Sequence, residues 1–198
     1  MEGDICAVCC GTSREATVTC PFECDYLREA RLHDKPAAGP LLHKEVEITE
    51  NFMARNEILL LICTQLWWRV AQDREGVLDS DVREALAAVV RQRKTASTSG
   101  LIYTERPRNA IAAGLQQGFE AKFAEWRAEI EARAVAEGLE GEMVREGDVL
   151  KMLIFLERLA ASMENGRPRC RAFVDTLRGW NARVAPAGAP VASSVVAP

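Results

Sequence analysis

Hydrophobic side chains recur every three or four residues through most of the chain, which is the spacing of one face of an α-helix. This pattern starts near Glu47 and continues to Trp180, with interruptions at glycine, asparagine and proline. Outside the N-terminal segment we find no sustained alternation of apolar and polar residues, which would be typical of a half-buried strand. The pattern predicts a mainly α fold, a bundle of about five helices.

Start and stop signals divide this pattern into five predicted helices. They run from Thr49 to about Asp73, from Asp79 or Ser80 to about Ser97, from Pro107 to Gly138, from Asp148 to Asn165, and from Pro168 to Trp180. Trp67 and Trp68 widen the apolar stripe of the first helix, so we expect that helix at the centre of the fold. In the last helix, Phe173, Leu177 and Trp180 are expected to face inward.

The predicted bundle, residues 48–182, is flanked by segments of different composition. Residues 1–35 hold five of the seven cysteines, and residues 36–47 begin with a proline- and alanine-rich stretch. Beyond residue 183 the chain is rich in alanine, proline, serine and valine and has no charge. We therefore expect a Cys-rich module, a linker, a helical bundle and a flexible tail over residues 183–198.

The composition and the net charge exclude some classes of protein. The 198 residues are 48% hydrophobic and 27% charged, which suffices for a packed core. The 25 basic and 29 acidic residues give a net charge of −4, which argues against a surface that attracts nucleic acid as a whole. No apolar run approaches the roughly 20 residues of a membrane helix, and Met1–Asp4 lack the basic charge of a secretory signal. We expect a cytoplasmic protein without a membrane partner.

The cysteines of the N-terminal segment form two close pairs with one extra sulfur. A first pair, Cys6 and Cys9, is separated by about a dozen residues from a second pair, Cys20 and Cys24. A tetrahedral thiolate site needs this arrangement, and a reducing compartment favours metal ligation over disulfides. The predicted metal ligands are therefore these four cysteines, with Cys10 as an alternate ligand in place of Cys9.

The residues between the two pairs suggest how the chain would return to close such a site. Gly11 suits a tight turn after the first pair, and residues 15–19 favour a short strand or one arm of a hairpin. Residues 22–33 are predicted to form a helix, whose dipole would stabilise thiolates at Cys20 and Cys24.

In motif and layout, residues 6–24 resemble zinc-ribbon and treble-clef modules, which combine a knuckle, a β element and a cysteine pair that begins a helix. The segment departs from the usual form because three residues, not two, separate the second pair, and because Cys10 is a fifth sulfur. The resemblance implies a structural metal site, often with a recognition surface, and no catalytic activity of its own. It does not extend to residues 48–182.

Other interpretations of the cysteines stay open. Four thiolates bind an iron–sulfur cluster equally well, and the adjacent Cys9 and Cys10 offer a choice of ligands. A thiol–disulfide redox relay and free cysteines are the remaining alternatives. The expected cofactor is zinc, with an iron–sulfur cluster as the alternative.

Two Arg-Pro-Arg triplets stand at predicted helix starts, Arg106-Pro107-Arg108 and Arg167-Pro168-Arg169. If the bundle brings them together, their guanidinium groups and free backbone amides would form a site for phosphate, nucleic acid or an acidic peptide. The simpler interpretation is that proline starts helices and that arginine is common in this chain.

The sequence shows no catalytic constellation. We find no phosphate-binding Gly-rich loop, no nucleophile elbow and no Ser/His/Asp set, and the chain has two histidines. Whether it is an enzyme stays undecided. The predicted function is that of a non-enzymatic metal-binding adaptor or regulatory protein, a zinc module docked on a helical bundle.

Its partner would be a protein or a nucleic acid, and the nucleic acid would bind through Arg106, Arg108, Arg167 and Arg169. The alternative function is an iron–sulfur or thiol-based redox or sensor protein that uses the same cysteine cluster. Association of several copies through the wide apolar helices is a further open alternative.

Overall fold

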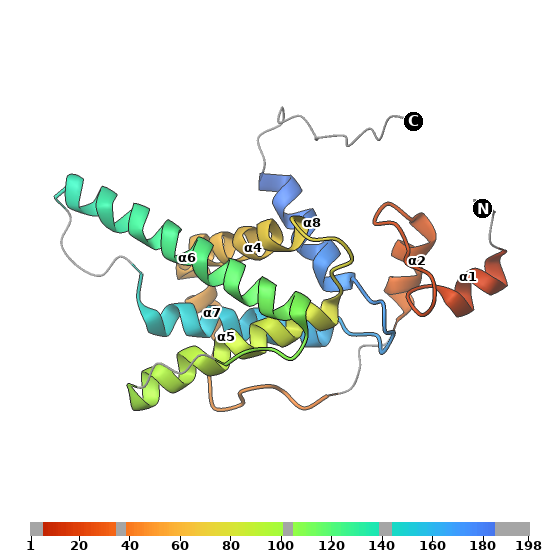
Figure 1. Ribbon diagram of the computed structural model, residues 1–198, viewed down its shortest axis with the longest axis horizontal. Coiled ribbons are helices and arrows are strands. Elements are labelled where there is room, and N and C mark those ends of the chain that lie inside the picture. The colour runs from red at the N-terminus through yellow and green to blue at the C-terminus, as the bar shows by residue number, and fades with distance from the viewer. Residues whose placement is uncertain (1–5, 35–38, 101–104, 139–143, 185–198) are drawn as a thin grey trace.

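The computed structural model describes residues 6–34, 39–100, 105–138 and 144–184. Within these ranges the chain forms eight α-helices and no strand, which confirms the predicted mainly α fold class. The helices are α1 (Ala7–Ser13), α2 (Asp25–His33), α3 (Glu50–Arg55), α4 (Glu57–Gln72), α5 (Asp79–Ser99), α6 (Ala110–Ala136), α7 (Glu146–Ser162) and α8 (Ala172–Val184). Figure 1 shows α4 to α8 packed together, with α1 and α2 at one end of this bundle.

The first predicted helix is two helices in the structure. Thr49 starts α3 as predicted, because its hydroxyl accepts a hydrogen bond from the Phe52 N–H at 3.1 Å. At Asn56 the helix breaks: the backbone takes φ −113° and ψ 24°, and the side-chain amide donates to the Phe52 carbonyl at 3.0 Å. A side chain that bonds to the backbone in this way competes with the helical hydrogen-bond ladder.

Helix α4 lies in the middle of the bundle, where it contacts α6, α7 and α8. Trp67 is fully buried and stacks on Phe119 of α6, with the ring centroids 4.4 Å apart. Phe119 in turn stacks on Phe123 at 5.7 Å, so the three rings form a continuous aromatic row through the core. Among the helices of the described residues, none is both long and apolar enough to cross a membrane.

The last helix begins four residues later than predicted, at Ala172 instead of Pro168, because another element caps it. The buried carboxylate of Asp79, at the start of α5, accepts hydrogen bonds from the N–H groups of Phe173 and Val174, both at 3.0 Å. The Asp79 N–H donates to the Cys170 carbonyl at 2.9 Å. Burial raises the pKa of Asp79, although the two N–H groups act in the opposite direction. These bonds fix the loop between α7 and α8 on the end of the bundle.

Part of the predicted linker is attached to α7. The guanidinium group of Arg158 donates to three backbone carbonyls, those of Leu42 at 2.9 Å, His43 at 2.6 Å and Val46 at 2.8 Å. The His43 ring also lies 3.0 Å from the carboxylate of Glu157. Residues 36–38 of the predicted linker and residues 185–198 of the predicted tail lie outside the described residues.

The close approach of α4 and α6 gives a test of the packing. A Cβ added at Gly118 of α6 would lie 2.7 Å from Cγ1 of Val70, a buried and β-branched side chain that has little freedom to move away. Gly118→Ala should therefore lower the free energy of unfolding by about 1–3 kcal/mol in chemical denaturation.

Gly179→Ala in α8 is the matched control, because nothing lies within 4 Å of the added Cβ there. It should raise the free energy of unfolding by about 0.5–1 kcal/mol through helix propensity alone. Equal effects of the two substitutions would contradict the close packing of α4 on α6.

Candidate functional site

The first cysteine pair lies at the start of a short helix and not in the predicted turn. Cys6 caps α1, and its sulfur accepts a hydrogen bond from the Cys9 N–H at 3.4 Å. Gly11 is inside this helix, so the turn expected there is wrong. The strand expected over residues 15–19 is also wrong: the backbone makes turns and an isolated bridge between Arg14 and Val18.

The second pair is split between a loop and a helix terminus. Helix α2 begins at Asp25, three residues later than predicted, with Cys24 as its N-cap residue. Cys24 thus lies at the helix N-terminus as expected, whereas Cys20 is buried in the preceding loop. The Cys20 carbonyl accepts a hydrogen bond from the Arg171 side chain, so the bundle holds this loop directly.

The four predicted metal ligands, Cys6, Cys9, Cys20 and Cys24, do not form a metal site in this structure. In the described part of the chain, no group of three or more His, Cys, Asp or Glu side chains is arranged to hold a metal ion. Cys6 and Cys9 are in contact, both exposed, and all seven cysteines are free thiols. The donor chemistry suits zinc, because four thiols in two close pairs stand within one short segment. Among the described contacts, a hydrogen bond joins Cys6 and Cys9, and none joins Cys20 and Cys24.

The surroundings of four thiols, those of Cys6, Cys9, Cys63 and Cys170, shift their pKa values. Hydrogen bonds from the Cys9 backbone N–H and thiol lower the pKa of Cys6, and the same thiol contact raises the pKa of Cys9. In the bundle, burial raises the pKa of Cys63 and of Cys170 to about 12, so both are neutral at pH 7. The two thiols of the bundle are therefore poorly suited to bind a metal or to act as nucleophiles at neutral pH.

A buried carboxylate joins the N-terminal segment to the bundle. Glu15 is 1% exposed and has a left-handed backbone with φ 51°, a conformation that costs energy in a non-glycine residue. Its carboxylate accepts hydrogen bonds from Arg31 at 2.8 Å and from Asn165 at 3.0 Å, and its carbonyl accepts from the Arg169 N–H at 2.8 Å. Arg31 also pairs with Asp175 of α8 at 2.8 Å. These contacts hold residues 6–34, which we call the N-terminal module, on the bundle.

The second Arg-Pro-Arg triplet belongs to this junction. Arg167 donates to the carbonyls of Arg14 at 2.6 Å and Gly11 at 3.3 Å, and Arg169 donates to the Thr19 hydroxyl at 2.9 Å. Two guanidinium groups of the same region, those of Arg171 and Arg178, lie over the ring of Phe22 at 4.2 Å and 4.8 Å. Four arginines from the bundle thus contact the module.

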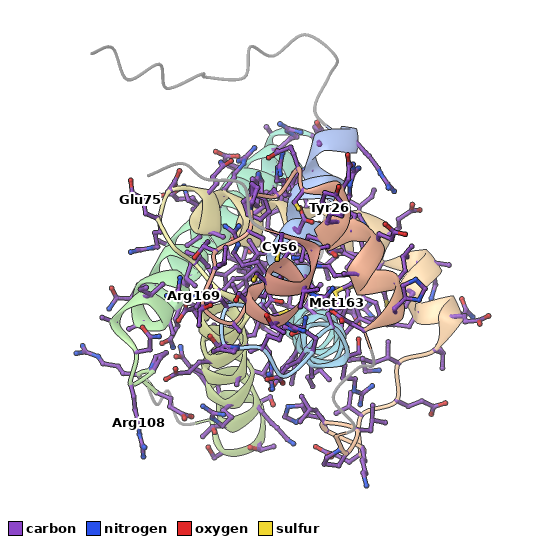
Figure 2. The ribbon with its side chains drawn as sticks, turned by 90° about the vertical axis from the view of Figure 1, so that its right-hand side faces the viewer. Cys6, Tyr26, Glu75, Arg108, Met163 and Arg169 are labelled. Atoms are coloured by element: carbon purple, nitrogen blue, oxygen red, sulfur yellow. The ribbon has the colours of Figure 1, made fainter. Side chains whose placement is uncertain are left out.

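The first triplet does not join the second one. Arg106 and Arg108 are exposed before α6, and the Arg108 N–H donates to the carboxylate of Glu84 at 2.6 Å. Figure 2 shows Arg169 beside the module and Arg108 pointing away from it at the edge of the molecule. The anion site that combines both triplets is therefore not formed by this arrangement.

No local pattern in the sequence marks Glu15, Arg31 or Asn165 as the residues of the junction. One general signal exists: residues 1–35 carry seven acidic side chains against four basic ones, whereas the loop after α7 is rich in arginine. Opposite charges of this kind indicate that two segments attract each other, but not which residues meet.

Four large apolar side chains of the module are exposed to solvent. Val8 is 77% exposed, Tyr26 76% and Leu32 82%, and Val18 is exposed as well. Only three other large hydrophobic side chains of the described residues are so exposed, Leu41, Ile58 and Val135. The short module therefore holds most of the large apolar groups that face solvent.

Comparison of the chain with protein-family models, with curated proteins and with solved structures finds no match.

The junction gives a second test. Glu15→Ala removes the carboxylate that Arg31 and Asn165 contact and leaves a largely buried guanidinium group with one partner fewer. Loss of one partner of a buried pair costs about 3–5 kcal/mol, so the module should detach. Hydrogen exchange should rise in residues 6–34 while α4 to α7 stay protected.

Asp25→Ala is the control, because Asp25 pairs with Arg28 in a fully accessible setting, with side chains 83% and 66% exposed. Its hydrogen exchange should match that of the unaltered protein. Unchanged protection of the module in Glu15→Ala would show that Glu15 does not hold the junction.

Proposed function

We propose that this protein is a non-enzymatic adaptor or regulatory protein, in which the N-terminal module binds zinc, is docked on the helical bundle and presents a surface to a protein partner. The observation that carries the proposal is the distribution of side chains on the module: the Arg31–Glu15 pair is largely buried against the bundle, whereas Val8, Tyr26 and Leu32 face solvent. Exposed large apolar groups of this kind are typical of a surface that binds another protein.

Zinc is supported by the thiols and by the small core of the module. Cys20 and Leu27 are its only buried apolar side chains in the described range 6–34. A segment this short buries too little apolar surface to fold alone, and a structural metal is a common additional constraint. The N–H to sulfur hydrogen bond from Cys9 to Cys6 also favours a thiolate, which is the form that binds a metal.

Metal analysis tests this proposal. Protein purified without chelator should contain about one zinc ion per chain. Cys6→Ser should remove most of the zinc and loosen the module, whereas the helical circular dichroism of the bundle should persist because its core is separate. Cys63→Ala alters a buried cysteine of the bundle and should keep the zinc.

Two results would contradict zinc binding and would support the alternative function, an iron–sulfur or thiol-based redox or sensor protein. Visible absorbance with iron and sulfide in the purified protein would indicate an iron–sulfur cluster. Metal-free protein in which Cys6 and Cys9 form a disulfide in glutathione buffer would indicate a thiol-based redox or sensor protein. The contact between these two exposed cysteines, one helical turn apart, is the observation that favours this second function.

A protein partner is favoured over nucleic acid because the module engages Arg167 and Arg169. The accessible pair, Arg106 and Arg108, offers little positive charge on a chain whose net charge is −4. A labelled DNA duplex or single-stranded RNA should therefore show no salt-sensitive binding at about 50 mM salt.

If such binding is observed, and if Arg106→Glu with Arg108→Glu abolishes it, then a nucleic-acid partner replaces the protein partner. Arg133→Glu, at an exposed position in the last turn of α6, is the matched charge reversal and should have no effect.

A further inference from the structure

A cleft of about 580 Å³ lies between the N-terminal module and the bundle. Helix α2 contributes Arg28 and Arg31 to its wall, the end of α7 contributes Met163, and α8 contributes Trp180 and Arg183. Figure 2 shows Met163 beside the ribbon of the module. The volume lies within the range of about 300–1,000 Å³ that is typical of small-molecule sites, which often form where two units of a protein meet.

The carboxylates that line the cleft are all paired, whereas two of its arginines, Arg28 and Arg183, are exposed. Its three carboxylates are each bound by an arginine, namely Asp34 by Arg14, Glu164 by Arg83 and Asp175 by Arg31. Arg28 pairs only with the exposed Asp25, and Arg183 has no ion-pair partner among the described residues. An anion in the cleft would therefore meet the unpaired guanidinium group of Arg183, that of Arg28 in a solvent-exposed and readily exchanged pair, and no free carboxylate.

One face of α8 adds an aromatic ring and open space to these charges. Trp180, which the sequence pattern places inside the core, is instead half-buried and lines the cleft. Gly179 precedes it, and a Cβ added there would meet no atom within 4 Å. Arg183 follows one turn later on the same side of the helix. An accessible indole ring next to cations suits a flat, anionic molecule.

We propose that this cleft binds a small organic anion that carries a flat ring, with the ring against Trp180 and the anionic group held by Arg28 and Arg183. No cysteine lines the cleft, so none of the predicted metal ligands would contact the bound anion. The ligand would contact both the module and α8. It would therefore stabilise the docked arrangement by mass action.

Calorimetric titration of the full chain with adenosine monophosphate tests this inference, with ribose 5-phosphate as the matched anion that has no flat ring. Adenosine monophosphate should bind once per chain, about tenfold or more tightly than ribose 5-phosphate. Trp180→Leu should remove this preference. Arg183→Gln should weaken both ligands, because it removes a cation and leaves the ring.

Gly179→Leu should block the site, because the added side chain fills the open space of the cleft without meeting another atom at its Cβ. The affinity for adenosine monophosphate should fall about tenfold or more, while the helical content stays unchanged. Gly147→Leu in α7 is the control, since its Cβ also meets nothing within 4 Å and it lies outside the cleft. It should bind like the unaltered protein.

Two results would overturn the inference. One is the absence of saturable binding of adenosine monophosphate. The other is binding that Gly179→Leu and Arg183→Gln both leave unchanged, because the ligand would then occupy another place. If Gly179→Leu proves unfolded, Arg183→Gln decides, since Arg183 is exposed and its replacement removes no packing.

Discussion

The arrangement of the two parts of this chain depends on the buried carboxylate of Glu15. A carboxylate in this position is favourable only while its partners are present, because removal of a charge from water costs several kcal/mol. Its partners come from α2 and from the loop before α8, 16 and 150 residues away in sequence. The left-handed backbone at Glu15 is maintained by the same contacts. Attachment of the module is therefore cooperative, since Arg31 and Asn165 lose a partner together if Glu15 leaves.

The helices of the bundle could be predicted because their signals are local. The start of α3 follows from the capping residue Thr49 next to an apolar repeat. Helix α5 begins at Asp79, within the predicted start, although its N-cap residue is Leu78. The start of α8 could not be predicted, because Asp79 supplies its cap from another helix. Proline at position 168 marks a possible helix start, but the backbone that follows is bound by Glu15 and Asp79 before the helix can begin.

In the candidate site, too, the local features could be predicted from the sequence and the contacts between distant segments could not. The sequence indicates that Cys6 and Cys9 lie together and that Cys24 lies at the N-terminus of a helix, and the structure shows both. Spacing does not indicate what the arginines bind. Arg167 has the sequence context of an anion site, yet its guanidinium group donates to two backbone carbonyls of the module. Such carbonyls have no signature in the sequence, because every residue carries one.

The attachment of residues 42–46 to Arg158 limits how far the module can move after it detaches. Only a few residues join Asp34 at the end of α2 to this fixed segment. A fully extended chain spans about 3.5 Å per residue, so a released module stays within a few tens of ångströms of its docking site. Its effective concentration there is on the order of millimolar. A molecule that competes for the inner face of the module must overcome this concentration, whereas one that binds its outer face meets no such competition.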